Sequence, residues 1–390
     1  MPKSGRLAAL ALVVLIWSLG LSSIGRGAQQ WDFHTYYHAA RAHAGGINPY
    51  DTEALERHAR TRIQLPFVYP PPALAFFRLF SFADYPDAVR IYFFAKLLTL
   101  AGMALLLSLV VLEERRPEFF FLFSALAFNG AVFLDLRSGN PSLFEQAVLW
   151  GAFAFYLRGR LGLFCLGVLV AASVKLQPLV FLGLLAFHPS RHRWRWLAGA
   201  IAAFAAFQAA SWLLAPELTR SFWQGLWGVN SGIVFHERGI INPSSYAFLE
   251  DVWELIRANG GPAAGPSLRT AVYAAAAAAV AAATLRALAR PGRPRTAADL
   301  REGVFLFCCA YALIAPRFKD YTYVLLLAPA FHLVREAKPS SFALLFVLFS
   351  LSTGLPGIPE HRIFFSFLWS YYPLALAAFS WALYLRRCAP

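Results

Sequence analysis

The sequence predicts an all-α protein that crosses a membrane many times. Of its 390 residues, 58% are hydrophobic and only 14% are charged, whereas an average soluble protein has about 25% charged residues. Apolar runs of membrane-spanning length recur along the chain, and short basic segments follow many of them. A soluble protein of this length would need a charged shell around each domain, so the composition excludes an ordinary soluble enzyme.

The apolar runs define the expected spans, because a helix needs about 20 mostly apolar residues to cross a bilayer that offers no water to its backbone. The first run, 7–25, begins like a signal peptide, but its length and the lack of a clear cleavage site favour a retained anchor. With the runs that follow, about twelve transmembrane helices are expected. The later ones are 88–112, 119–135, 142–157, 161–174, 178–187, 195–214, 267–289, 303–315, 321–335, 340–354 and 366–385.

The run 161–187 is interpreted as two helices because of its flanking charges. Arg160 precedes it and the basic cluster 188–195 follows it, and the positive-inside rule places both on the cytoplasmic side. Proline interrupts a helix, and an intramembrane lysine needs a polar cavity. We therefore expect two short helices that meet at Lys175, just before Pro178, near the outer face.

Positive charge also gives the expected orientation. About half of the 35 Lys and Arg residues lie in short segments assigned to the inside. Both termini are then cytoplasmic, in a multi-pass protein of the inner (plasma) membrane. The net charge of +14 is mainly a topology signal, and no nucleic-acid-binding motif accompanies it. Membrane lipid is therefore an expected partner and nucleic acid is not.

The large connections all lie outside in this topology. Residues 26–87 form a first long outer loop with amphipathic, interfacial helices, and residues 215–266 form a second. Function is expected there because binding and catalytic residues concentrate on loops held by a scaffold. The whole chain, 1–390, is expected to be a single transmembrane domain. No internal repeat is visible, which disfavours transporters built from repeated halves.

Individual polar residues of the outer segments have competing interpretations. Asp32 follows the first span, and it suits either an N-cap of the next helix or a carboxylate that deprotonates a hydroxyl. For Asp51, which precedes Thr-Glu-Ala-Leu, the N-cap is favoured. Lys175 is either a phosphate partner or a snorkelling lysine beside a helix break, and Arg317 and Lys319 are either phosphate partners or charges at a helix end. Cysteine spacing predicts no metal site.

Several motifs, taken in order, resemble those of glycosyltransferase family 87. The resemblance covers roughly residues 30–335. Its first part is Asp32, Tyr36, Ala39-Ala40 and Gly46-Ile47-Asn48-Pro49-Tyr50-Asp51, then Tyr69-Pro70-Pro71 before an apolar helix. The later parts are Ser138-Gly139-Asn140-Pro141, Val174-Lys175-Leu176-Gln177-Pro178 and Ala315-Pro316-Arg317-Phe318-Lys319-Asp320-Tyr321.

The resemblance implies a GT-C fold and an inverting transfer of a hexose, typically mannose. The donor would be a polyprenyl-phosphate sugar, the acceptor a lipid or glycan hydroxyl, and the site would face the outer, periplasmic side. No cofactor is implied, and the absence of a Rossmann-type glycine-rich turn agrees with a donor that is not a nucleotide sugar.

Candidate site residues follow from this chemistry. Asp32 matches the family's catalytic aspartate and is the expected base. Lys175, Arg317 and Lys319 are expected to bind the donor phosphate. Several relatives have histidine where this chain has Asp320, which departs from the pattern. The expected substrate-binding residues are Tyr36, Tyr69, Asn140, His236 and Asp320.

Two other functions use the same lipid-linked sugars. A transporter or flippase would have a midplane site with gates on both faces, whereas a glycosyltransferase would have a one-sided outer cavity. A ligase would use the same class of donor and a whole glycan as acceptor, so the size of the product separates it from a hexosyltransferase.

Overall fold

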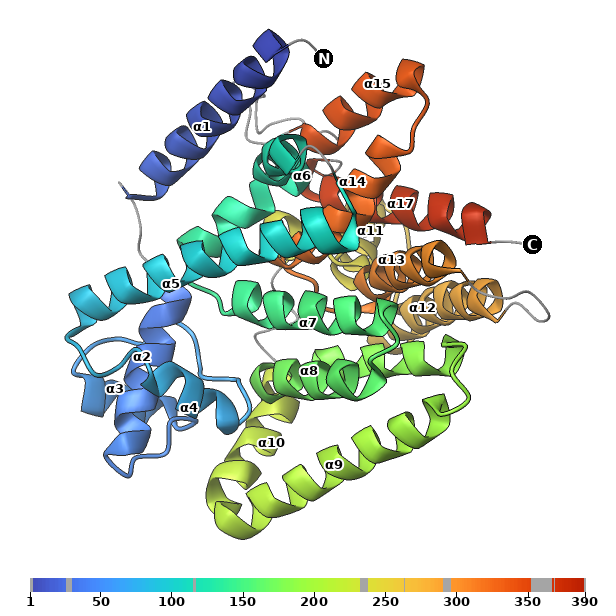
Figure 1. The fold of residues 1–390 in the computed structure, drawn as a ribbon. Coiled ribbons are helices and arrows are strands. Elements are labelled where there is room, and N and C mark those ends of the chain that lie inside the picture. The colour runs from blue at the N-terminus through green and yellow to red at the C-terminus, as the bar shows by residue number, and fades with distance from the viewer. Residues whose placement is uncertain are drawn as a thin grey trace. The chain divides into compact units, whose positions relative to one another are not determined.

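The regular structure is helical throughout the described part of the chain. The computed structural model describes residues 3–25, 30–114, 117–231, 238–262, 264–289, 296–351, 367 and 369–388, and their regular elements are all helices (Figure 1). This confirms the all-α prediction. The chain divides into two compact units. Unit 1 contains Met1–Ser18, Ser108–Val132 and Phe235–Pro390, and unit 2 contains Leu19–Leu107 and Phe133–Val234.

Four of the described helices are long and apolar enough to cross a membrane, which supports a membrane protein. The expected number of twelve spans stays a prediction, because the other apolar helices are shorter. The four are Tyr85–Val111, formed by α5 (Tyr85–Leu105) and the π-helical η1 (Leu106–Val111), α6 (Pro117–Ser138), α9 (Arg193–Leu214) and α12 (Pro266–Leu288). The shorter ones are Leu10–Ser22 within α1 (Lys3–Gly25), α8 (Leu161–Val174), η2 (Gln177–Phe187) and α15 (Pro339–Ser350).

Unit 2 begins with the end of α1 and three short helices, which Figure 1 shows gathered beside one end of α5. These are α2 (Trp31–Ala44), α3 (Thr52–Ala59) and α4 (Pro72–Arg78). Asp51 caps α3, since its Oδ1 accepts a hydrogen bond from the Ala54 amide at 3.0 Å, as predicted. Pro72 occupies the first turn of α4, where a missing N–H costs nothing.

Aromatic side chains form the core that joins α2, α4 and α5. The ring of Phe33 stacks on Tyr92 with centroids 4.0 Å apart, and the ring of Tyr36 stacks on Phe77 at 4.4 Å. Each aromatic side chain buries a large apolar area and fixes ring geometry. The buried side of α2 is therefore held rigidly, and Asp32 lies on the first turn of this helix.

The remaining helices of unit 2 are α7 (Ser142–Leu157), α8, η2, α9 and α10 (Pro216–Ser231). α7 and α8 lie side by side (Figure 1). A Cβ added at Gly167 would lie 2.8 Å from the Cβ of Ala152, so the small residues allow a close contact. The predicted interruption is confirmed: α8 ends at Val174, Lys175 is extended, and η2 starts at Gln177.

Unit 1 contains the remaining helices, and α12 and α13 lie side by side in it (Figure 1). The expected span 119–135 falls within α6 (Pro117–Ser138), which is not a regular helix throughout. Residues 127–130 have non-helical backbone angles, with three consecutive left-handed residues ending at Gly130. The other elements are η4 (Gly239–Ile241), α11 (Ser245–Ala258), α13 (Ala297–Ile314), η5 (Asp320–Leu326), α14 (Leu327–Arg335) and α17 (Tyr372–Cys388).

Candidate active site

Asp32 is the second residue of α2 and is not its N-cap. That position belongs to Gln30, whose backbone is left-handed (φ 34°, ψ 50°). The Asp32 side chain turns inward and is only 3% exposed. One carboxylate oxygen, Oδ2, accepts a hydrogen bond from Nδ2 of Asn140 at 2.7 Å. A buried carboxylate is stable only where such donors compensate for lost hydration.

Asn140 lies in the turn between α6 and α7, which comes close to α2. Gly139 has φ +73°, a conformation that favours glycine, and a Cβ there would lie only 3.0 Å from the Cβ atoms of Gln30 and Phe33. Both the backbone conformation and the lack of space therefore require glycine at this position. The Asn140 amide nitrogen also lies 3.3 Å from the Tyr36 hydroxyl and 3.2 Å from the Tyr69 hydroxyl. Two aromatic hydroxyls, one carboxylate and one amide thus meet at this point.

The two tyrosines form a pair of their own. Their hydroxyl oxygens are 2.8 Å apart, and the Tyr50 hydroxyl donates to the main-chain oxygen of Tyr69 at 2.6 Å. Burial raises the pKa of Tyr69 above its ordinary value, although the positive charge of Lys175 partly opposes this. The phenol therefore stays protonated near neutral pH and offers a hydrogen-bond donor.

Lys175 meets the other end of the same asparagine. Its Nζ donates to Oδ1 of Asn140 at 3.1 Å and to Oγ of Ser142 at 2.6 Å, and it forms an ion pair with Oε2 of Glu145 at 3.1 Å. These contacts match the three donors of an ammonium group. Lys175 is thus part of a polar cluster, in contrast to a lysine that snorkels to the membrane surface. Glu145 was not foreseen as its partner.

A fully buried ion pair fixes the turn that contains Asn140. Lys96 and Asp135 have no exposed side-chain surface, and Nζ of Lys96 lies 2.5 Å from Oδ1 of Asp135. The same ammonium donates to the main-chain oxygens of Asp135 and Asn140. Neither residue was predicted to take part in the site, although each is a charge at or inside an apolar run, which indicates a functional residue or a structural pair.

Unit 1 contains the late candidates Arg317, Lys319 and Asp320. Lys319 is the N-cap residue of η5, its ammonium lies 5.9 Å from the centroid of the Tyr321 ring, and Oδ1 of Asp320 accepts from the Tyr321 amide at 2.7 Å. Asn242 anchors this segment, since its Oδ1 accepts from the Phe318 amide at 3.0 Å. The role of the three candidates stays a prediction.

Two further contacts join the same segment to the stretch before α11. The Ser244 hydroxyl donates to the Pro316 oxygen at 2.8 Å, and the Tyr323 hydroxyl donates to the Pro243 oxygen at 2.7 Å. The motif Asn242-Pro243-Ser244 therefore holds the late segment in place. His236 lies outside the described residues. In the part of the chain that is described, no three His, Cys, Asp or Glu side chains gather as a metal-binding cluster.

Comparison with known proteins identifies the family. The model of glycosyltransferase family 87 matches residues 67–316. The chain belongs to this family. No curated protein matches the chain, and no solved structure does. The family 87 match is shorter than the expected 30–335: it includes Tyr69, Asn140 and Lys175, but it begins after Asp32 and ends before Arg317.

Proposed function

We propose that this family 87 glycosyltransferase moves a hexose, mannose foremost, from a polyprenyl-phosphate carrier to a hydroxyl of a lipid or glycan. The reaction inverts the anomeric carbon and takes place at the outer face of the inner membrane, with both chain termini in the cytoplasm. The family supports the transferase activity. The carrier, the sugar and the orientation rest on the distribution of charge and on the chemistry of the candidate residues.

One observation carries the proposal: a single asparagine joins a buried carboxylate to an ammonium group. Asn140 donates to Asp32 through its nitrogen and accepts from Lys175 through its oxygen. An inverting transfer needs a base for the acceptor hydroxyl and a cation for the departing phosphate. Asn140 contacts both groups through the two ends of one amide, so the carboxylate and the ammonium lie on either side of the same side chain.

The transfer can be written with these residues. An oxygen of Asp32 takes the proton of the acceptor hydroxyl, and the hydroxyl oxygen forms a bond to the anomeric carbon of the donor sugar. The bond between that carbon and the phosphate oxygen breaks, and its electron pair stays on the phosphate. The carrier phosphate changes from a diester with one negative charge to a monoester with two. A nearby ammonium stabilises this added charge.

Lys175 can supply that charge only by exchanging a partner. Its three donors are directed to Asn140, Ser142 and Glu145. We expect the donor phosphate to replace Ser142 or Glu145, because the contact to Asn140 keeps Asp32 oriented. Arg317 and Lys319 are the proposed additional phosphate partners, and Tyr36, Tyr69, Asn140, His236 and Asp320 are the proposed sugar-binding residues.

The test is transfer in liposomes that contain the purified protein, labelled polyprenyl-phosphate mannose and total membrane lipids and glycans. We expect a new labelled lipid or glycan larger than its acceptor by one hexose. Polyprenyl-phosphate glucose in a parallel reaction tests the choice of sugar. Movement of the donor between leaflets without product would support a flippase, and transfer of a long glycan would support a ligase. Either result would contradict the proposal.

A further inference from the structure

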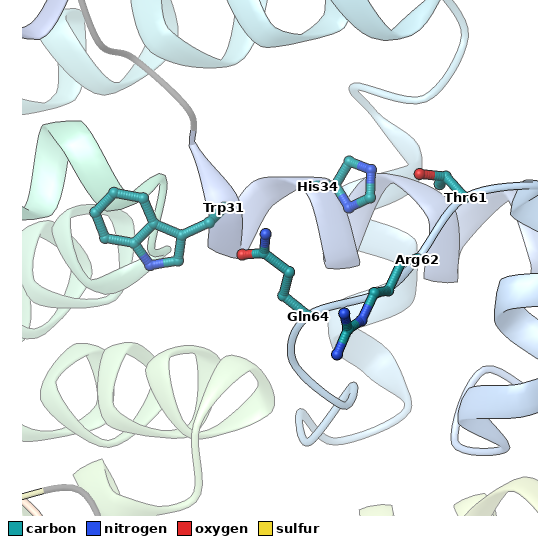
Figure 2. A pocket seen from close by; sticks show the side chains of 5 residues that line it. All are labelled: Trp31, His34, Thr61, Arg62 and Gln64. Carbon is teal, nitrogen blue, oxygen red and sulfur yellow. The ribbon is translucent and has the colours of Figure 1, made fainter.

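A pocket of about 390 Å³ lies in unit 2, beside the first turn of α2. Its lining consists of Trp31, His34, Thr61, Arg62 and Gln64. Figure 2 shows the first two extending from α2 and the other three from the segment that follows α3. Because 3.6 residues make one helical turn, Trp31 and His34 lie on the same turn of α2 as Asp32. The pocket and the proposed base therefore share the first turn of α2, although Asp32 itself is not part of the lining.

Hydrogen bonds build this pocket and hold its two walls together. α3 ends at Ala59, and the left-handed backbone of the next residue, Arg60 (φ 51°), turns the chain back. The Ile63 amide donates to Oε1 of Glu56 at 2.9 Å. The Thr35 hydroxyl on α2 donates to the Leu65 oxygen at 3.0 Å. The segment is thus bonded to α3 at Ile63 and to α2 at Leu65, which positions its side chains beside α2.

The lining combines one aromatic ring, three neutral polar groups and one cation. Indole faces pack on the C–H faces of sugars, and hydroxyl and amide groups bind sugar hydroxyls. Burial lowers the pKa of His34, so its imidazole is neutral near pH 7. The guanidinium of Arg62 has no hydrogen-bond or ion-pair partner among the described residues. In contrast, Arg57 pairs with Glu53 at 3.8 Å.

We infer that this pocket binds the acceptor of the transfer, and that the acceptor is a sugar or polyol head group with an attached phosphate or carboxylate. The inference rests on the proposed function, because it takes Asp32 as the base for the acceptor hydroxyl. The polar lining suits a hydrated head group better than a polyprenyl chain. Arg62 presents a planar pair of donors, which matches the two oxygens of a carboxylate or phosphate.

Direct binding tests the pocket without any transfer. Purified protein in phosphatidylcholine nanodiscs would be titrated with methyl mannoside 6-phosphate, methyl glucuronide and neutral methyl mannoside. We expect both anionic glycosides to bind at least about tenfold more tightly than the neutral one, since only they can pair with the guanidinium of Arg62. The comparison of phosphate with carboxylate identifies the anionic group.

Three variants give the controls. Arg62→Gln should reduce the affinity for the anionic glycosides to that for the neutral one. Trp31→Leu should weaken all three alike, and Arg57→Gln, a matched change on exposed α3, should change none. Wild-type protein that does not distinguish charged from neutral glycosides, or an Arg62→Gln variant that still does, would overturn the inference. Unfolding temperatures of the variants exclude misfolding as the cause.

Transfer kinetics then separate the two proposals. If the wild-type protein transfers mannose, Arg62→Gln should raise the KM for an anionic acceptor about tenfold or more and leave the KM for the donor unchanged. An unchanged acceptor KM would contradict the pocket while the transferase proposal stands. If wild-type protein binds the anionic glycosides but transfers no sugar, the proposed function fails and the binding site remains.

Discussion

The amide nitrogen of Asn140 lies 2.7 Å from a carboxylate oxygen of Asp32, and both groups are almost completely buried. They are 108 residues apart in the chain, on α2 and on the turn before α7. The contact orients the carboxylate, and the other end of the same amide faces Lys175. The side chain of Asn140 therefore links the proposed base to the proposed phosphate-binding lysine, and its removal is the first structural test.

Asn140→Ala should lower the rate of sugar transfer about 100-fold, because the Asp32 carboxylate and the Lys175 ammonium lose their common partner. Removing one preorganised hydrogen-bond donor from an active site typically costs about 2.7–4 kcal/mol of transition-state stabilisation. The fold should persist at a cost in stability, because Lys96 still holds the main-chain oxygen of residue 140 while the Asp32 carboxylate loses one donor. Steady-state kinetics in liposomes give the effect. Asn259→Ala, at the exposed end of α11, is the control and should transfer at the wild-type rate.

Lys175 can be tested without leaving an unpaired charge. The double variant Lys175→Gln/Glu145→Gln replaces the ion pair with two neutral amides of similar size. We expect it to fold and to lose transfer by at least about 100-fold, because no ammonium remains for the departing phosphate. Glu145→Gln alone keeps that ammonium and should stay within about tenfold of wild type. Equal activity of the double and the single variant would show that Lys175 does not act on the phosphate.

Lys96→Met should destabilise the protein by about 3–5 kcal/mol, because it leaves the Asp135 carboxylate buried without its partner. Denaturant unfolding in detergent micelles measures the loss. Adding Asp135→Leu should recover much of it, as apolar replacements of a whole buried pair often do. Arg90→Met, which breaks an exposed pair with Asp87, is the control and should cost at most about 1 kcal/mol. Equal losses of stability for Lys96→Met and Arg90→Met would contradict a structural role for the buried Lys96–Asp135 pair.

His38 on α2 predicts a pH dependence of stability. Burial, followed by the positive charges of His34, Arg41 and His58, lowers its pKa from 6.5 to about 4. Below pH 6.5 the His38 imidazole is protonated in the unfolded chain, but it stays neutral in the folded protein until the pH approaches 4. The free energy of unfolding should therefore fall as the pH drops from 6.5 towards 4. Because the side chain is partly solvated, we expect a loss of about 1–2 kcal/mol.

Unfolding temperatures between pH 7 and pH 4.5 check this effect. His38→Gln should flatten the profile in that range, and His192→Gln, on an exposed turn, should leave it unchanged. A profile that keeps its slope in His38→Gln would assign the pH dependence to other groups.

The sequence predicted much of this site because composition restricts where polar residues can lie. Asp32 and Lys175 stood out as charges at the end of or inside apolar runs, and the break after Val174 followed from Lys175 and Pro178. Asn140 was expected only from the resemblance to family 87. Glu145 was not predicted as a partner of Lys175, because contacts between different helices depend on helix rotation, which a single sequence does not give. The kink at residues 127–130 could have been suspected from Asn129-Gly130, a common turn dipeptide.

The assignment of Asp32 as the base is tested by the substitution Asp32→Asn. An asparagine can still accept the hydrogen bond from Asn140, so the fold should remain while the base is lost. With labelled polyprenyl-phosphate mannose and total membrane lipids, we expect the rate to fall at least about 100-fold, a typical cost of removing a general base. Asp51→Asn is the matched control, because asparagine also caps a helix and α3 should persist. Wild-type transfer by Asp32→Asn would contradict the assignment of the base.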